Sequence, residues 1–568
     1  MKRLYFTIGC LGMIWLAYGT QPDSGSAGSP MDNSIHSWVF FTDKPVATSP
    51  VASLSVRTIA RRQRNGAPVG GWLDRWPSGD YIATLQSLGL TIRHRSRWMN
   101  AVSVAGTEDQ LAAVEALPFV SRIQPVRMTR QPREDFQPVS SPPVRLNRDS
   151  RTLDYGYATD QIQQIRINRL HDLGFNGAGV RILVMDTGFN LTHPAFDSLH
   201  VIAQWDVIND DSVCANETAE ETSAGQHNHG TVVLSAMAGY LPGELIGPAY
   251  GAEFLLAKTE IVDQEIELEE DNYVAGLEWG EARGADMVST SLGYLDWYTY
   301  CDMDGNTAVT TNAIDHAVSL GLICVTAMGN EGGFSPPVNP CQDELTYYMI
   351  APADADSVIS VGAVDSKGNP AYFTSHGPTY DGRIKPEVCA RGIQTAAVNP
   401  NTDGYIYSNG TSLSTPLIGG ATAVLAGAHP DWTPMQIREA LMNTASQANL
   451  PDNTVGYGVA NYWDAYQYAF VAVDGERNVF PESYSVISTW PNPFNGEFTV
   501  SLNLEKALTG SLSLVDLQGR TLEIIDSGVF PTGTLTYNVK ALQGPSGVYF
   551  LMLKTGDRVR THKLIYLK

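Results

Sequence analysis

The middle of the chain carries short apolar runs, each ending at glycine and polar residues. Residues 180–185 (Val-Arg-Ile-Leu-Val-Met) and 322–327 (Leu-Ile-Cys-Val-Thr-Ala) are continuous enough to predict buried strands of a parallel sheet. Residues 417–426 are apolar almost all round, which predicts a buried helix, and Pro416 suits the first position of that helix. These runs indicate an open α/β sheet, whose chemistry is expected at the carboxyl ends of the strands.

The two ends of the chain follow other patterns. An apolar run from Leu4 to Tyr18 follows Met-Lys-Arg; it is short for a membrane span and has a signal-peptide layout, which we assign to residues 1–19. Residues 80–130 alternate strand-like and helical patterns, including a predicted helix over 107–116. After Trp490, short alternating runs predict a small antiparallel β-sandwich with strands at 498–504, 511–515, 535–539 and 547–553.

Charge divides the chain at similar places. The whole chain has a formal net charge of −23. Residues 36–150 carry 15 Lys and Arg against 9 Asp and Glu, residues 151–480 carry 12 against 42, and residues 481–568 carry 8 against 7. Opposite net charges favour docking of the basic segment onto the acidic one. The alternative is a permanent basic domain with a binding role of its own.

Ser412 lies in the segment 409–416, Asn-Gly-Thr-Ser-Leu-Ser-Thr-Pro. Gly410 permits a tight turn, and the serine would sit near the positive dipole end of a buried helix, beside free backbone N–H groups. Taken alone, this segment is equally consistent with a capped core helix. A serine nucleophile also needs a base to take its proton and a third group to orient that base.

Three polar residues upstream can supply those groups. Asp186 directly follows the strand at 180–185, and Asn330 follows the strand at 322–327. His229 lies in the first turn of a small, apolar helix pattern. Each has a simpler reading as a turn former or a polar first-turn residue. Together with Ser412, however, they contain the order Asp, His, Ser of one known hydrolase triad.

With these motifs, the chain resembles the subtilisin-like serine proteases. Asp186-Thr-Gly, His229-Gly-Thr, Gly329-Asn330 and Gly410-Thr-Ser412 carry the resemblance, which runs from about Tyr155 to Trp463. It implies an α/β fold with a subtilisin-like, doubly wound, mostly parallel sheet. The chain departs from the family at two packing positions: Val232 stands where a second histidine is usual, and Ser414-Thr415 replaces a small Ala-Ser pair.

The resemblance implies a mechanism. His229 would take the proton of Ser412 and later give it to the leaving amine, while Asp186 fixes the histidine tautomer. Asn330 and the Ser412 backbone N–H would hold the oxyanion. The segment 287–293 matches the family's substrate-binding strand, with a pocket formed near Ser291, Leu292, Gly293 and Gly329.

His227 is a second candidate base, or half of a metal site with His229. No third ligand of matching spacing accompanies the pair, so we predict no catalytic metal and no cofactor for the chemistry. Residues 302–306, Asp-Met-Asp-Gly-Asn, have oxygen ligands but lack the closing acidic residue of a calcium loop. The resemblance allows structural calcium without assigning a site. The acidic run from Glu265 to Asp271 is predicted to be a solvated loop that leads into a helix.

The resemblance also extends over both flanks. Residues 36–130 resemble the inhibitory pro-domain of subtilases, and 131–153, rich in Pro, Arg and Ser, predict an exposed linker where cleavage would occur. The catalytic domain is predicted over 155–472. Residues 482–568 resemble the C-terminal sorting domain of type IX secretion in Bacteroidota, with a carbohydrate-binding or structural sandwich as the alternative. The protein is therefore expected to be secreted or attached to the cell surface.

Cysteine usage fits an exported protein. Cys10 falls in the signal peptide, which leaves an odd number of cysteines in the rest of the chain. Cys301 and Cys341 lie in polar segments and are the best candidate disulfide. Cys324 and Cys389 are expected to be buried thiols, with Cys214 unpaired.

Three functions are therefore compared. The leading hypothesis is a secreted serine endopeptidase made as an autoinhibited precursor. Its partners would be protein or peptide substrates, its own pro-domain and the secretion machinery, with no nucleic acid. The others are a catalytically silent subtilase fold used for adhesion, and a serine hydrolase that acts on esters.

Overall fold

The structure is a computed structural model. It describes residues 35–126, 137–138, 153–262, 270–295, 298–343, 347–469, 484–490, 498–504, 507–516, 520–540, 547–555 and 558–566. The predicted signal peptide and most of the predicted linker lie outside these residues. The chain forms two compact units, which divide between Ala469 and Phe470.

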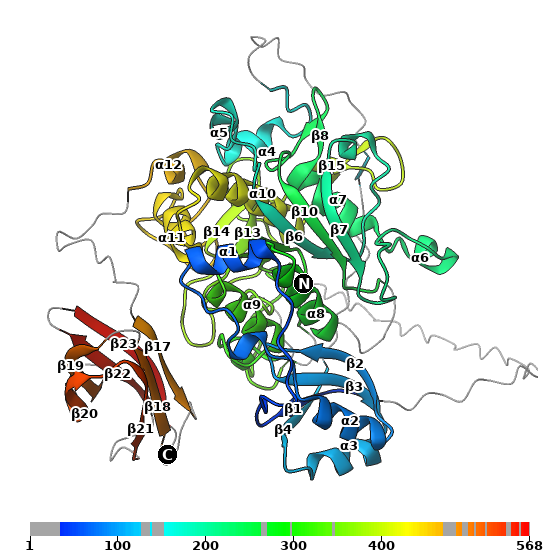
Figure 1. The fold of residues 1–568 in the computed structure, drawn as a ribbon. Helices are drawn as coiled ribbons and strands as arrows, with labels where there is room; N and C mark the ends of the chain where they lie inside the picture. Colours follow the sequence, from blue (N-terminus) through cyan, green and yellow to red (C-terminus); the bar gives the residue numbers. More distant parts are fainter. Residues whose placement is uncertain are drawn as a thin grey trace, which may run out of the picture. The chain divides into compact units, whose positions relative to one another are not determined.

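A seven-stranded sheet forms the centre of the first unit (Figure 1). All its neighbouring strands pair in parallel, as predicted. In spatial order they are β14 (Val388–Arg391), β13 (Ile359–Val364), β12 (Ile323–Ala327), β11 (Met287–Thr290), β6 (Arg181–Asp186), β10 (Glu253–Lys258) and β7 (His200–Asp206). Since β11 lies between β6 and β12, the carboxyl ends of these three strands meet at one edge.

Helices cover both faces of this sheet, which makes it doubly wound (Figure 1). On one face lie α7 (Asn228–Ala238) and α10 (Thr411–Ala428), and on the other α8 (Glu270–Ala282) and α9 (Val309–Ser319). Side chains of β6 alternate between the faces: Leu183 and Met185 join the core cluster beneath α8 and α9.

Shorter elements complete the unit. They are β5 (Gln137–Pro138), α4 (Thr159–Gln164), α5 (Asn168–Asp172), η2 (Pro194–Phe196), α6 (Ala219–Ala224), β8 (Tyr240–Leu241), β9 (Leu245–Ile246), η3 (Tyr300–Asp302), β15 (Thr395–Val398), β16 (Tyr405–Ser408), α11 (Pro434–Thr444) and α12 (Tyr462–Tyr466). No helix among the described ranges combines the length and apolarity needed to cross a bilayer.

The basic N-terminal segment has an α+β fold of its own. Its antiparallel sheet has the order β2 (Thr91–Ser96), β3 (Ala101–Gly106), β1 (Ile35–Phe41), β4 (Val120–Pro125). The predicted helix over 107–116 is α3 (Glu108–Glu115), which begins after a Thr107 capping box. The segment between β1 and β2 holds α1 (Val56–Arg64), η1 (Trp72–Asp74) and α2 (Gly79–Ser87).

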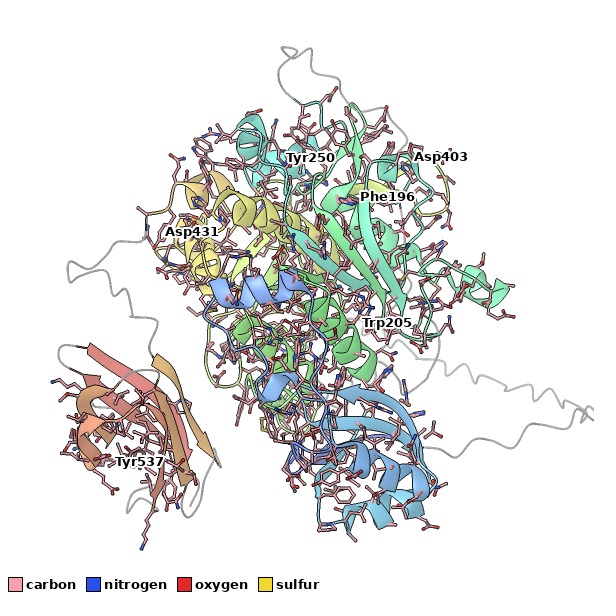
Figure 2. The ribbon with its side chains drawn as sticks, viewed as in Figure 1. Phe196, Trp205, Tyr250, Asp403, Asp431 and Tyr537 are labelled. Carbon is pink, nitrogen blue, oxygen red and sulfur yellow. A yellow bond between two sulfur atoms is a disulfide. The ribbon has the colours of Figure 1, made fainter. Side chains whose placement is uncertain are left out.

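The second unit is the predicted antiparallel sandwich. One sheet has the order β17 (Tyr484–Trp490), β18 (Phe498–Leu504), β21 (Gly533–Val539), and the other β20 (Thr521–Phe530), β19 (Leu508–Val515), β22 (Gly547–Thr555), β23 (Arg558–Tyr566). Val500 and Leu502 of one sheet share a core with Leu512 and Leu551 of the other. Tyr537 packs against this core and donates from its hydroxyl to Asp526 at 2.7 Å (Figure 2).

Two sequence-based predictions were wrong. Pro416 is not the first residue of its helix, because α10 begins at Thr411 and the proline lies inside it. The end of the acidic run is not a solvated loop, since Glu270 and Asp271 are fully buried at the start of α8; residues 265–269 lie outside the described residues. The cysteine pairing was right: Cys301 and Cys341 form a disulfide, and Cys214, Cys324 and Cys389 are buried thiols.

Candidate active site

The four predicted site residues come from four different elements. Asp186 is the last residue of β6, and Asn330 follows β12 in the loop. His229 and Ser412 are each the second residue of a helix, α7 and α10. Strand ends and helix starts thus supply all four side chains at one edge of the sheet, as expected for an open α/β fold.

Asp186 and His229 form a direct hydrogen bond. The Nδ1 atom of His229 lies 2.6 Å from the Asp186 carboxylate Oδ1, which also accepts from the Thr187 backbone N–H at 2.7 Å. Asp186 is fully buried and His229 is 7% exposed. A buried carboxylate on Nδ1 holds the ring so that its other nitrogen, Nε2, is the atom available for proton transfer.

Gly230 makes this contact geometrically feasible. A Cβ atom at this position would lie 2.2 Å from the carbonyl oxygen of Gly188 and 2.9 Å from the Asp186 Cβ. Only glycine lets the first turn of α7 approach the end of β6 so closely. The sequence shows the glycine that directly follows His229. It does not show why glycine is needed, because the close approach of α7 to β6 is known only from the structure.

Ser412 lies in the first turn of α10, whose N-cap is Gly410 with a φ of +149°. Because Pro416 has no N–H, it cannot donate to the carbonyl oxygen of Ser412 four residues earlier. The hydroxyl of Ser291 donates to that carbonyl instead, at 2.9 Å. A proline inside this helix is therefore tolerated through a contact from the end of β11.

Asn330 is fixed beside Ser412 through Thr411. The side-chain oxygen of Asn330 accepts from the Thr411 backbone N–H at 2.9 Å and from its hydroxyl at 3.0 Å. With that oxygen occupied, the amide nitrogen is the end that can donate to a ligand. Sequence reasoning missed Thr411, because its role depends on a contact 81 residues away.

The predicted substrate segment, 287–293, begins as β11, and its residues 291–293 follow that strand directly. Ser291 contacts Ser412 as described, whereas the Leu292 side chain is buried in the core beneath α8 and α9. A Cβ at Gly293 would lie 2.2 Å from Ile350 Cδ1, and Gly329 has a φ of +106°. At Leu292 and Gly293, backbone groups are thus what a ligand could contact, which suits an extended peptide.

Other reactive groups do not compete with this site. His227 is the N-cap of α7, and its Nδ1 accepts from the Asn216 backbone N–H at 3.1 Å. Burial raises the pKa of the Cys214 thiol to about 12, so it is protonated at neutral pH.

Among the described residues, one acidic cluster has metal-ligand spacing, at Asp206, Asp211 and Glu217; it includes neither His227 nor His229. Asp206 is already ion-paired with Lys258 at 2.8 Å.

A short piece of the predicted linker lies next to the strand that leads to Ser412. Gln137 and Pro138 of β5 pair antiparallel with Tyr407 and Ile406 of β16. The pairing places this piece of the linker beside β16, whose last residue, Ser408, precedes Ser412 in the sequence.

Comparison with known families gives three matches. Residues 177–458 match the subtilase family, residues 36–138 match a peptidase S8 propeptide domain of Bacteroidota, and residues 488–567 match a secretion system C-terminal sorting domain. The three matches follow the three regions that charge and pattern distinguish.

The relatives include subtilisins of Bacillus species. Subtilisin DY of Bacillus licheniformis is 30% identical over 320 residues, which cover 56% of this chain and 100% of that protein. Subtilisin of Bacillus pumilus is 30% identical over 286 residues, covering 50% of this chain and 90% of that protein. Subtilisin E of Bacillus subtilis (strain 168) is 31% identical over 286 residues, and the chain spans 65% of its length.

Proposed function

The chain belongs to the subtilase family, and from this premise we propose that it is a secreted serine endopeptidase made as an autoinhibited precursor. The observation that carries the proposal is the 2.6 Å hydrogen bond between Asp186 and His229, at the sheet edge where the helix that contains Ser412 begins. A base oriented by a buried carboxylate is what a weak serine nucleophile needs.

The proposed reaction assigns one role to each residue. His229 takes the proton of Ser412 as its hydroxyl oxygen bonds to the peptide carbonyl carbon, and then protonates the departing amine. Water hydrolyses the resulting acyl-enzyme by the same proton transfers in reverse. Asp186 stabilises the imidazolium, and Asn330 with the Ser412 N–H donates to the oxyanion. No step needs a cofactor.

The substrate would lie along the segment after β11 and take part in backbone hydrogen bonds with residues 291–293. Gly329 would leave room for a side chain of the substrate beside this segment. A structural calcium ion is compatible with this proposal but has no assigned residues.

We propose the following organisation around this site. Residues 36–130 act as the inhibitory pro-domain, 131–153 as the linker that is cut, and 155–472 as the catalytic domain. Residues 482–568 direct the chain to the secretion machinery, which suits a secreted or surface-attached protease. Positions 1–19 would be the signal peptide.

Probe labelling tests the function directly. We expect the processed protein to hydrolyse peptides and to react with a fluorophosphonate at Ser412, which peptide mapping by mass spectrometry would locate. Turnover of esters but not peptides would favour the ester hydrolase instead. A protein that is folded and processed by other proteases, but neither labelled nor active, would favour the silent adhesive fold.

Asn330→Leu is expected to lower kcat by about 10²–10³-fold with little change in KM, a magnitude known for the equivalent loss in subtilisin itself. Leucine keeps the volume of the side chain but has no donor for the oxyanion. Steady-state kinetics on a peptide substrate would measure the effect. The exposed Asn443→Leu on α11 is the control and should leave both constants unchanged. An Asn330 variant with unchanged kcat would remove this residue from the mechanism.

A further inference from the structure

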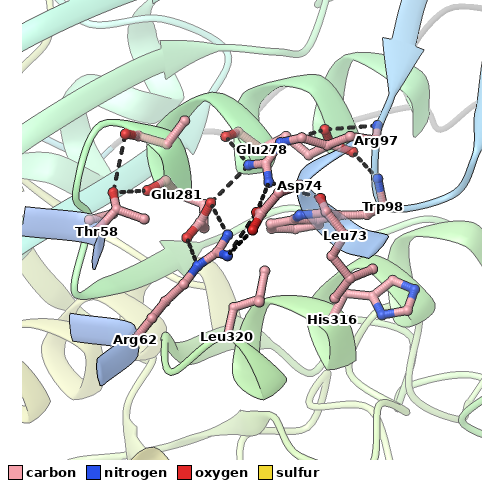
Figure 3. A network of polar contacts seen from close by, with 12 residues as sticks. Thr58, Arg62, Leu73, Asp74, Arg97, Trp98, Glu278, Glu281, His316 and Leu320 are labelled. Carbon is pink, nitrogen blue, oxygen red and sulfur yellow. Dashed lines mark hydrogen bonds and ion pairs between the residues drawn. The ribbon is translucent and has the colours of Figure 1, made fainter. Parts of the chain in front are cut away.

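Three arginine side chains of the N-terminal segment are buried against α8, away from Ser412. Arg61 and Arg62 lie on α1, and Arg97 follows β2; each is at most 1% exposed. All three contact Glu281 near the end of α8. Figure 3 shows Arg62 and Arg97 in their network with Asp74, Glu278 and Glu281. We propose that Glu278 and Glu281 form a guanidinium-recognition site that anchors the pro-region, residues 35–126, independently of the active site.

The contacts have the geometry of specific recognition. Arg62 binds Glu281 with two parallel bonds, Nε to Oε1 and Nη2 to Oε2, both at 3.0 Å. Its Nη1 donates to both oxygens of Asp74, at 2.7 and 2.9 Å. This fork-to-fork arrangement needs a planar guanidinium, and the point charge of a lysine cannot reproduce it.

Arg97 completes the site from a second element. Its Nη2 donates to Glu281 Oε2 at 2.8 Å, and its backbone N–H donates to Glu278 Oε2 at 3.1 Å. The other oxygen of Glu278 accepts from the Ser96 hydroxyl at 2.6 Å and the Trp98 N–H at 3.1 Å. The turn after β2 is therefore fitted around one carboxylate of α8.

The charges balance only while the two parts are together. Three guanidinium groups face the carboxylates of Asp74, Glu278 and Glu281, and none of these side chains is more than 4% exposed. Burial alone would raise the pKa of Glu281, but the arginines outweigh it and hold that pKa below its usual value. Separation would break this matched set of contacts at once, and removing one partner within the complex would leave a buried charge uncompensated, which is strongly unfavourable.

The Arg61 side of the anchor lies at the opposite end of the sheet from the proposed active site, because Arg61 donates to the carbonyl of Ala285, shortly before β11. On α1, Arg57 donates to the carbonyl of Gly179 and to Asp286, which precede β6 and β11. Asp186 and Ser291 are at the other ends of these strands, and a six-residue strand spans about 20 Å. Cutting the linker near Ser412 would therefore leave the anchor intact, and buried pairs are screened little by salt.

This inference rests on the proposed precursor function in one respect, because it assumes that the linker is cut. In the test, an added protease therefore cuts the linker. The full chain would carry Ser412→Ala and a recognition sequence for an added protease, inserted between Ser140 and Ser141. After cleavage, the pro-region is expected to stay bound to the remainder in 1 M NaCl on size-exclusion chromatography. Immediate release from the otherwise unaltered chain would overturn the proposal.

Two variants test the recognition itself. Glu281→Gln keeps the shape but removes the charge, and Arg62→Lys keeps the charge but removes the fork. We expect each to speed release of the cut pro-region by at least about 100-fold. Arg64→Lys is the matched control on the same helix, because its side chain is 56% exposed, and it should release at the parent rate. Release of both variants at the parent rate would contradict the proposal.

Hydrogen exchange gives a second readout that requires no change in the network. In the cut Ser412→Ala chain, backbone amides of residues 59–64 in α1 should stay as protected as before cleavage. Loss of that protection while the catalytic part remains folded would overturn the proposal, even where a network variant does not fold. Neither measurement depends on whether the protein is a protease.

Discussion

Replacing Ser412 with alanine is expected to lower kcat for peptide hydrolysis by about 10⁶-fold, the scale known for loss of the serine in subtilisin itself. The hydroxyl oxygen is the proposed nucleophile, and the unpaired cysteines among the described residues, Cys214, Cys324 and Cys389, are all buried. The variant should also fail to react with a fluorophosphonate. Active-site titration and peptide turnover would measure both effects.

Ser414→Ala is the matched control for this variant. Ser414 lies two residues further along α10, is fully buried and donates to the Thr411 carbonyl at 3.0 Å, so its loss removes a hydroxyl from the same helix without removing the nucleophile. We expect less than about a tenfold change in kcat, since one internal hydrogen bond contributes about 1 kcal/mol. Equal losses in the two variants would mean that packing of α10, not a nucleophile, had been tested.

Asp186→Asn is expected to lower kcat by about 10⁴-fold, again a magnitude known from serine proteases of this mechanism. Asparagine preserves the shape of the side chain, but an uncharged amide favours the wrong histidine tautomer and no longer stabilises the imidazolium. The 2.6 Å contact between His229 and a fully buried carboxylate makes this residue the sensitive one. Steady-state kinetics would show the loss chiefly in kcat.

The control for this variant is Asp403→Asn. Asp403 is exposed in the turn between β15 and β16, so the same chemical change should leave kcat unaltered. Thermal unfolding of both variants would show whether the fold is retained. A kcat for Asp186→Asn within tenfold of the parent would remove the carboxylate from the proposed mechanism.

The elements that hold the site could be predicted because their signals are local. The apolar run 180–185 overlaps β6 (Arg181–Asp186), and the alternating pattern at 498–504 matches β18. Asp186 could be placed at the carboxyl end of its strand for the same reason. Such patterns depend on burial of consecutive or alternate residues, which the sequence displays directly.

The burial of α1 could not be predicted because it depends on distant charges. Val56–Arg64 contains four arginines, a composition typical of a solvated helix. Arg62 is nevertheless fully buried, because Glu281 binds its guanidinium. This partner lies 219 residues further along the chain, so a local pattern cannot reveal it. The burial of Glu270 and Asp271 was missed in the same way. An acidic run is usually solvated, and the sequence shows no partner for these two carboxylates.

The predicted position of Pro416 was wrong for a related reason. Local rules place proline in the first turn of a helix, where its missing N–H costs nothing. The actual position, inside α10, is acceptable because Ser291 supplies a donor to the carbonyl that the proline leaves unpaired. That contact spans 121 residues, so it appears only once the fold is known.

The same contact has a mechanical consequence. Ser412 belongs to α10, and Ser291 begins the segment on which we propose that the peptide lies. The hydrogen bond from the Ser291 hydroxyl to the Ser412 carbonyl connects this segment directly to the helix. A shift of the segment after β11 would therefore carry the start of α10 with it. Thermal motion at this edge would then move the attacking oxygen and the bound peptide in step, so that the distance between them varies less than the position of either.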